Sequence, residues 1–166
     1  QVIGVEPVYS EVHKITVSSG SFISERDVNS MTKVAVLGPQ VVEDLFGEGA
    51  NPTGKNIRIE GQSFRVIGVT ESKGGSGFQN QDDIIYVPLT TAQKSLYGAN
   101  YLSSIAIAAK SEDEMVAAQD EVGYLLLDRH NISDPADADF RIMSQSDILS
   151  TASSVTSTFT TLLTGI

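Results

Sequence analysis

The chain contains no cysteine among its 166 residues. Zinc–thiolate sites, iron–sulfur clusters, thiol catalysis and disulfides are therefore excluded. Basic residues are also scarce, because 11 Lys and Arg stand against 21 Asp and Glu and leave a formal net charge of -10. Phosphate backbones are bound mainly through Lys and Arg, so nucleic acid is not expected as a partner.

Long apolar runs are missing as well. No stretch reaches the ~20 apolar residues of a membrane-spanning helix, and residues 1–5 lack the basic and apolar regions of a secretory signal peptide, so none is expected here. A chain of this length buries roughly 68–70% of its unfolded surface, enough for one domain or two small subdomains. The absence of cysteine slightly favours an oxidising, extracytoplasmic compartment.

Short apolar or alternating runs predict β-strands. They lie at Val2–Val5, Val12–Val17, Val34–Leu37, Ile84–Val87, Ser104–Ala108 and Phe140–Met143. The third run is apolar throughout and is expected to be buried on both faces. The polar, acidic segment 24–32 is predicted to be a turn region.

Apolar residues three and four positions apart, together with capping patterns, predict four helices. They begin at Pro39, Thr90, Ser111 and Ser144. Gly47 is the expected C-cap of the first. Capping boxes are expected at Thr90-x-x-Gln93 and Ser111-x-x-Glu114, and the third helix should run to His130. The last helix is an amphipathic segment rich in Ser and Thr.

The clearest predicted hairpin has Gly61-Gln62 as its two-residue turn. That turn would pair Ile59 with Phe64 on the apolar face. On the other face it would set Arg58 against Arg65, a like-charge pair that costs stability.

The segment 71–83 is rich in Gly, Ser, Asn and Gln and has almost no apolar periodicity, so we predict a long mobile loop. Phe78 stands alone in it as an aromatic residue.

Motifs for nucleotide binding or hydrolysis are weak. Residues 49–55 match the G-x-x-x-x-G-K pattern of a phosphate loop, but a predicted helix precedes them, a strand follows, and Asn56 replaces the hydroxyl that binds magnesium. A turn is the better interpretation. Residues 74–77 lack the context of a dinucleotide fingerprint, and no G-x-S-x-G elbow occurs.

The two histidines, His13 and His130, are each interpreted as structural. His13 shares a predicted strand face with apolar residues, and His130 lies at a helix C-terminus, where positive charge is favourable. Asp134, Asp137 and Asp139 leave a calcium site open, but their spacing is not that of an EF-hand loop and a solvated turn is favoured. We therefore expect no catalytic residue, cofactor or metal.

Several short motifs occur along the chain in the order seen in one protein family. They are Val2-Ile3-Gly4-Val5-x-Pro7-x-Tyr9, Val34-Ala35-Val36-Leu37-Gly38, Asp44-Leu45-Phe46, Gly54-Lys55-x-Ile57, Phe64-Arg65-Val66-Ile67-Gly68-Val69, Val87-Pro88-Leu89, Leu126-x-x-Arg129-His130, Asp139-Phe140 and Leu162-Leu163-Thr164-Gly165-Ile166. Over nearly its whole length the chain resembles the extracytoplasmic (periplasmic) core domain of MacB-type ABC transporter permeases, which are related to lipoprotein-release and FtsX-like permeases.

The resemblance implies an α+β fold with two intertwined α/β subdomains and a C-terminal stalk helix. Residues 1–9 and 101–150 would form a porter-like subdomain, and residues 10–100 an inserted, variable subdomain. Residues 151–166 would form the stalk leading to a membrane span that the chain lacks. The family's domain also has a further stretch before the first motif, which nothing here matches.

The resemblance also implies a mechanical rather than a catalytic role. ATP hydrolysis would occur in a separate cytoplasmic domain, and this extracytoplasmic part of an inner-membrane protein would transmit the motion and dock an adaptor protein, supporting export of macrolides, peptides or toxins. The implied partners are that adaptor, the ABC ATPase domain or subunit, the protein's own transmembrane helices and a second copy in a homodimer.

Adaptor contacts are expected in the loop 71–83, at Lys73, Phe78, Gln79 and Asn80. One alternative is a domain that captures a lipoprotein or another ligand in a lipoprotein-release or FtsX-like permease. A second alternative is an independent hydrolase, which the motifs support poorly.

Overall fold

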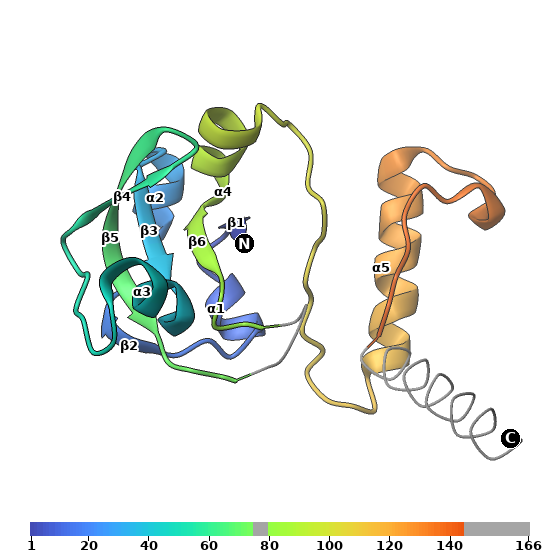
Figure 1. Cartoon of the computed structure of the whole chain (residues 1–166). Coiled ribbons are helices and arrows are strands. Elements are labelled where there is room, and N and C mark those ends of the chain that lie inside the picture. The colour runs from blue at the N-terminus through green and yellow to red at the C-terminus, as the bar shows by residue number, and fades with distance from the viewer. Residues whose placement is uncertain (75–79, 145–166) are drawn as a thin grey trace, which may run out of the picture. The chain divides into compact units, whose positions relative to one another are not determined.

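The structure, a computed structural model, describes residues 1–74 and 80–144. The chain divides into two compact units, Gln1–Ile107 and Ala108–Ile166 (Figure 1). The helix predicted after Ser144, including the stalk at 151–166, lies outside the described residues. The assignment of residues 1–9, 10–100 and 101–150 to porter-like and inserted subdomains stays a prediction.

A six-stranded mixed sheet forms the centre of the first unit (Figure 1). Its strands are β1 (Val2–Val5), β2 (Val17–Gly20), β3 (Val34–Leu37), β4 (Asn56–Ile59), β5 (Gln62–Thr70) and β6 (Ile85–Pro88). The order across the sheet is β1-β6-β3-β5-β2, and β4 also pairs with β5. The pairs β1–β6 and β3–β5 are parallel, and the remaining pairs are antiparallel. The predicted α+β class is confirmed.

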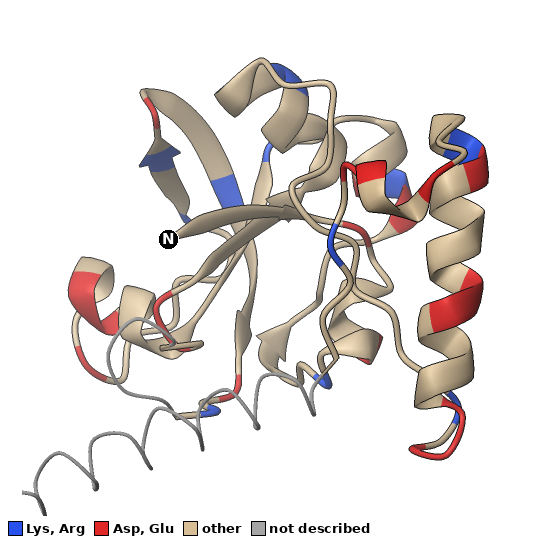
Figure 2. Cartoon of the chain, turned by 90° about the vertical axis from the view of Figure 1, so that its right-hand side faces the viewer, with Lys and Arg blue, Asp and Glu red and all other residues tan. Residues whose placement is uncertain are grey.

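Short helices connect these strands, and one long helix belongs to the second unit. They are α1 (Tyr9–Val12), α2 (Glu25–Asn29), α3 (Pro39–Phe46), α4 (Leu89–Thr91), which continues as the π-helix η2 (Ala92–Tyr97), α5 (Met115–His130) and the 3-10 helix η3 (Pro135–Asp137). No Asp or Glu lies in the six strands, whereas acidic residues occur in the loops and along α5 (Figure 2).

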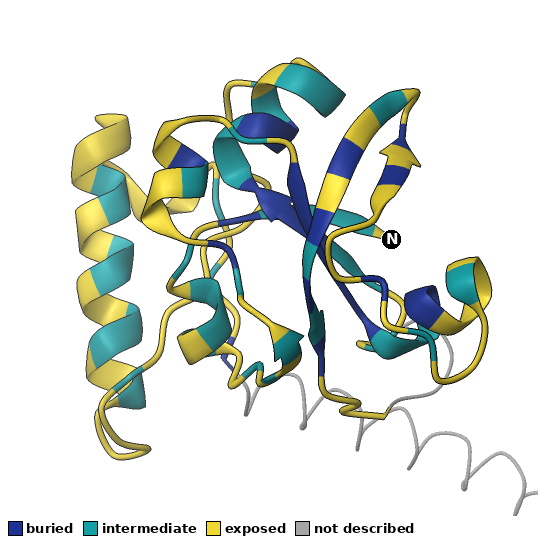
Figure 3. Ribbon diagram, turned by 90° about the vertical axis from the view of Figure 1, so that its left-hand side faces the viewer, coloured by how far each residue is buried: buried dark blue, intermediate teal, exposed yellow. Residues whose placement is uncertain are grey.

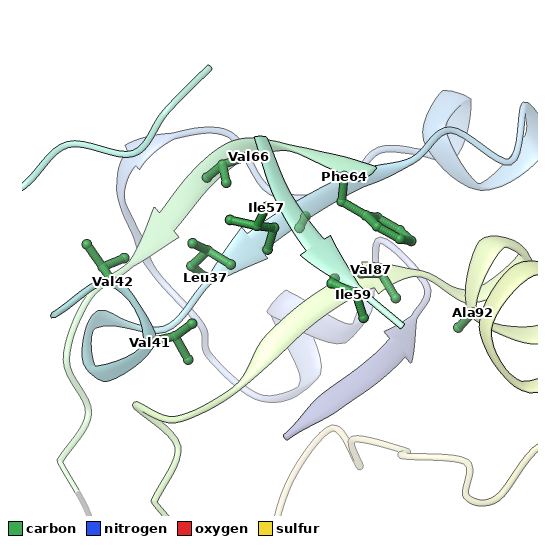
Figure 4. Close-up of a cluster of buried hydrophobic side chains, with 10 residues drawn as sticks. Leu37, Val41, Val42, Ile57, Ile59, Phe64, Val66, Val87 and Ala92 are labelled. Carbon is green, nitrogen blue, oxygen red and sulfur yellow. The ribbon is translucent and has the colours of Figure 1, made fainter. Parts of the chain in front are cut away.

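Strand β3 is buried along its whole length because helices cover both of its faces (Figure 3). Ala35 and Leu37 contribute to a cluster with residues of α3, β4, β5 and η2 (Figure 4). Val36 points into a second cluster with Val28 of α2 and Tyr86 of β6. Successive strand side chains alternate between faces, so an entirely apolar strand requires two apolar environments. The prediction for this run is confirmed.

The hairpin of β4 and β5 forms, but its predicted register was wrong. Ile57 pairs with Phe64, and the turn is Glu60–Gly61, with φ angles of 47° and 76°. Two consecutive positive φ angles fit the two-residue turns that match the twist of paired strands. The two-residue shift keeps the apolar residues on one face. Arg58 now faces Ser63, which removes the predicted like-charge pair.

The strand predicted at Val12–Val17 was also wrong. Residues 9–12 form α1, and β2 begins only at Val17. His13 follows α1 and stacks on the Tyr9 ring, with 4.1 Å between the ring centroids. Tyr9 in turn contacts Tyr86 of the sheet, so α1 is held against the second apolar cluster instead of extending the sheet.

Segment 24–32, predicted to be a turn region, contains helix α2. Ser24 and Asp27 form a capping box in which each side chain bonds the backbone N–H of the other. Asp27 also accepts a hydrogen bond of 2.8 Å from the Thr32 hydroxyl, which closes the segment. Five residues suffice for a helix here because Val28 is buried in the core and the cap satisfies its N-terminus.

We expect Asp27→Ala to lower the free energy of unfolding by about 1 kcal/mol at pH 7, the usual cost of losing a cap. Burial raises the pKa of the Asp27 carboxyl, but hydrogen bonds from Ser24 and Thr32 and the charge of Arg26 outweigh it, so the pKa lies below 3.8. A lowered folded pKa contributes stability above the unfolded pKa and loses it as the pH falls through the folded value. Urea unfolding should therefore show the difference at pH 7 and its decline below pH 3.8, whereas Glu25→Ala, in the same turn, should change little.

The helix predicted at Thr90 forms as α4 and η2, but without the predicted capping box. The hydroxyl of Thr91 donates to the Thr32 carbonyl at 2.9 Å, and that of Thr90 donates to the Val28 carbonyl. These two side chains therefore tie the segment after β6 to α2 and to the turn that follows α2.

In the second unit, α5 ends at His130 as predicted but begins at Met115, without the predicted capping box at Ser111. Its apolar stripe is half-buried, and none of its residues is fully buried (Figure 3). The strands predicted at 104–108 and 140–143 are absent from the described residues, where both segments are coil. None of the described helices has the length and apolar character needed to cross a membrane.

Candidate functional site: the base of the 71–83 loop

Asp82 holds the two described ends of the 71–83 loop together. We call these ends, residues 71–74 and 80–83, the loop base. One carboxylate oxygen of Asp82 accepts the Lys73 N–H at 2.8 Å, and the other accepts the Ser72 hydroxyl at 2.5 Å and the Gly74 N–H at 3.2 Å. Within the 80–83 end of the loop, the backbone N–H of Asp82 donates to the Asn80 side-chain oxygen at 3.0 Å.

The hydrogen bonds to Asp82 favour its ionised form. Burial acts to raise the pKa of the Asp82 carboxyl, but the bonds from Ser72, Lys73 and Gly74 outweigh it and hold the pKa below 3.8. Above that pH the carboxylate is charged and accepts all three bonds, which are stronger for a charged acceptor. The loop base is therefore clamped at neutral pH.

The backbone of Asp82 joins the loop base to the core. Its carbonyl accepts the N–H of Gln40, in the first turn of α3, at 3.0 Å. Gly38 at the N-cap of α3 donates to the carbonyl of Ile84, one residue before β6. The loop base is thus positioned by the end of β3, the start of α3 and the start of β6.

An aromatic and basic cluster lies beside the loop base. The Lys73 ammonium donates to the carbonyl of His13, whose ring stacks on Tyr9. Burial and the Lys73 charge lower the pKa of His13, so its ring is neutral near pH 7. Burial, with smaller contributions from Tyr9 and Asp82, raises the pKa of Tyr86 to about 12. Neither ring supplies a charge at neutral pH, which suits packing rather than proton transfer.

Two of the four predicted contact residues, Lys73 and Asn80, are brought together through Asp82. The other two, Phe78 and Gln79, lie outside the described residues. Sequence reasoning missed Asp82 itself. The available signal was an Asn two residues before an Asp at the start of an apolar strand, a pattern typical of a local side-chain turn.

The other residues that the sequence analysis weighed as functional make contacts within the fold. His130 pairs with Asp139 at 2.7 Å and meets the Phe140 ring edge-on. Asp134 accepts the Ala136 N–H at the start of η3. Residues 49–55 form the turn before β4, where Gly54 donates to the Val66 carbonyl. Within residues 1–74 and 80–144, no group of three or more His, Asp or Glu residues is arranged to hold a metal ion.

Residues 1–124 match the family model of the MacB-like periplasmic core domain. A curated relative, the macrolide export ATP-binding/permease protein MacB of Bdellovibrio bacteriovorus, is 38% identical over 167 aligned positions. The alignment covers 100% of this chain and 26% of the relative. The chain thus spans about a quarter of the length of the relative it matches.

Two solved structures are similar. The periplasmic region of MacB from Actinobacillus actinomycetemcomitans aligns with a TM-score of 0.73 and 25% identity, covering 92% of this chain and 64% of that one. The extracellular domain of the ABC-type transporter YknZ from Gram-positive bacteria aligns with a TM-score of 0.66 and 27% identity, covering 78% of this chain and 64% of that one. Both neighbours are extracytoplasmic.

Proposed function

Because the chain belongs to the MacB-like periplasmic core domain family, we propose that it transmits ATP-driven motion outside the membrane and docks an adaptor protein in an ABC efflux permease. In this proposal ATP hydrolysis occurs in a separate cytoplasmic domain and the chain itself is not an enzyme. The relative's name joins ATP binding, permease and macrolide export in one protein, of which this chain matches about a quarter.

The proposed membrane, oligomeric state and exported molecules rest on the same relatives. The domain would belong to an inner-membrane permease that works as a homodimer and exports macrolides, peptides or toxins. The extracytoplasmic origin of both solved neighbours supports the location. The backbone hydrogen bonds from Gln40 to Asp82 and from Gly38 to Ile84 support a mechanical role, because they join the loop base to the core.

The observation that carries the docking proposal is the Asp82 clamp. A partner that binds a loop must otherwise lose affinity to the entropy of ordering it. Three hydrogen bonds to one exposed carboxylate limit that entropy loss by fixing both ends of the loop before binding. Lys73 and Asn80 are then presented at defined positions on the two ends.

We expect Asp82→Ala in the full-length permease to weaken adaptor binding about tenfold, which corresponds to about 1.4 kcal/mol. The matched control is Asp83→Ala, which removes the same charge next to it. Only backbone atoms of Asp83 take part in the hydrogen bonds of the described residues. Binding is measured by titrating labelled adaptor onto permease in nanodiscs, and the control should bind like the wild type.

Hydrogen exchange on the same samples makes the result decisive. The amides of Lys73 and Gly74 should exchange faster in Asp82→Ala than in Asp83→Ala, because they lose their acceptor. Unchanged adaptor affinity together with faster exchange at these amides would remove the loop base from the docking surface. Equal loss of affinity in both variants would instead indicate a general charge effect.

A further inference from the structure

Strand β4 pairs with β5 on one side, and no other strand pairs with it in the part of the chain that the structure describes. The Val66 N–H donates to the Lys55 carbonyl, and hydrogen-bonded pairs alternate with non-hydrogen-bonded pairs along an antiparallel ladder. Ile57 is therefore in a hydrogen-bonded pair, whereas the N–H and C=O groups of Asn56 and Arg58 point away from β5. The outer edge of β4 thus offers backbone donors and acceptors for a further strand.

The exposed face of the same hairpin carries two arginines. Arg65 is opposite Asn56 and Arg58 is opposite Ser63, so the arginines are diagonal neighbours on one face. All four residues are exposed, and Figure 2 shows basic residues on both strands of the hairpin. Among the described residues, neither guanidinium forms an ion pair or a hydrogen bond. Long side chains at diagonal positions reach one another, so both guanidiniums can contact one partner.

The charge of this face indicates the chemistry of that partner. Guanidinium groups bind carboxylates through paired N–H donors. An extended segment with Asp or Glu at alternate positions would place its carboxylates beside Arg58 and Arg65 while its backbone pairs with β4. Charged side chains on an edge strand also hinder indiscriminate strand pairing, so the two arginines select by charge.

Other occupants of this edge fit less well. A second copy of β4 would add its own arginines to the same face, and each copy carries a net charge of -10, so two copies repel each other. The same net charge opposes binding to an anionic membrane surface, which extends far beyond two arginines. A single acidic strand meets the basic face alone.

We propose that the outer edge of β4, with Arg58 and Arg65, binds an extended acidic segment of another protein by strand addition. The backbone groups of Asn56 and Arg58 hold the segment, and the two guanidiniums select its carboxylates. The proposal does not depend on adaptor docking at the loop base, because the loop base and this edge share no residue.

The test titrates a labelled peptide, in which Glu alternates with Val, onto the full-length permease in nanodiscs of zwitterionic lipid. Arg58→Glu should weaken peptide binding at least about tenfold, because it places a carboxylate against the carboxylates of the peptide. The matched control is Lys94→Glu, which makes the same charge change at an exposed lysine of η2, outside the hairpin. The control should bind within about twofold of the wild type. Equal weakening in both variants would overturn the proposal, because it would indicate a general charge effect.

Two further peptides test the proposal without changing the protein. A peptide with Lys in place of Glu should not bind, since it carries the charge of the arginines. A peptide with Pro in place of the central Val should lose binding, because proline removes a backbone donor from the added strand. Equal binding of the proline peptide or of the lysine peptide would overturn strand addition by an acidic segment.

Hydrogen exchange identifies the edge directly. With saturating Glu-Val peptide, the Arg58 amide should exchange at least about tenfold more slowly, whereas the Ile57 amide, already paired with β5, should change little. Unchanged exchange at Arg58 would overturn the proposal. Binding of the 166-residue chain to phosphatidylglycerol vesicles that is lost in Arg58→Glu, without peptide binding, would also overturn it and assign this face to a membrane surface.

Discussion

Phe64→Ala is expected to lower the free energy of unfolding of the unit Gln1–Ile107 by about 3–5 kcal/mol, the usual cost of truncating a buried phenylalanine. The side chain is completely buried, and it packs between the hairpin and helix η2 in the largest apolar cluster (Figure 4). Small domains are stable by only about 5–15 kcal/mol, so this single change removes much of the margin. Urea unfolding followed by circular dichroism measures it.

Two further variants test the reason for this loss. Phe64→Leu keeps most of the apolar volume and should cost less than about 1.5 kcal/mol. Leu45→Ala removes a leucine that is 55% exposed on α3 and should change stability by less than about 0.5 kcal/mol. A loss below about 1 kcal/mol for Phe64→Ala would show that the hairpin does not cover the core as described.

Gly38→Ala is expected to cost about 2 kcal/mol and to loosen the loop base at the same time. A Cβ at this position would lie 2.2 Å from the carbonyl oxygen of Asp82 and 2.8 Å from its carbonyl carbon. Both atoms are backbone, so the strain is relieved only by moving the chain, which typically costs 1–3 kcal/mol. The backbone angles of Gly38, φ -70° and ψ 154°, suit any residue, so the cost is steric and not conformational.

The measurement combines urea unfolding with hydrogen exchange at the loop base. The Gln40 amide, which donates to the Asp82 carbonyl, should exchange faster in Gly38→Ala. The control is Gly123→Ala in α5, where the added Cβ meets Ile142 at 3.5 Å, an ordinary contact, and where alanine favours the helix. Unchanged stability and unchanged exchange in Gly38→Ala would mean that the first turn of α3 does not fix the loop base.

Where local pattern and burial agreed, the sequence predicted the structure well. The wholly apolar run at β3 is a strand covered on both faces, and α3 begins at Pro39 and ends before Gly47. The order of short motifs also identified the family, because it depends on residue identity along the chain and not on three-dimensional contacts. Lys73 and Asn80 lie in the loop base, where both form hydrogen bonds with Asp82, and their role as adaptor contacts stays a prediction.

Other features depended on contacts between distant residues. The pairing of Ile57 with Phe64 was decided by a turn at Glu60–Gly61, since alternation alone permits any even shift. Residues 9–12 became a helix because Tyr9 packs against Tyr86 of the sheet. The sequence offered only the local turn of Asn80 and Asp82 as a signal, whereas the donors that clamp the Asp82 carboxylate lie eight to ten residues away.

By itself, the sequence excluded thiol-based sites and disulfides, because the chain has no cysteine. It also identified the family, because the order of the short motifs is a property of the sequence alone. Only the tertiary structure decided the hairpin register and the Asp82 clamp. The physical reason is that alternating apolar residues indicate which face of a segment will be buried. They do not indicate which other segment supplies the hydrogen bonds and the covering side chains.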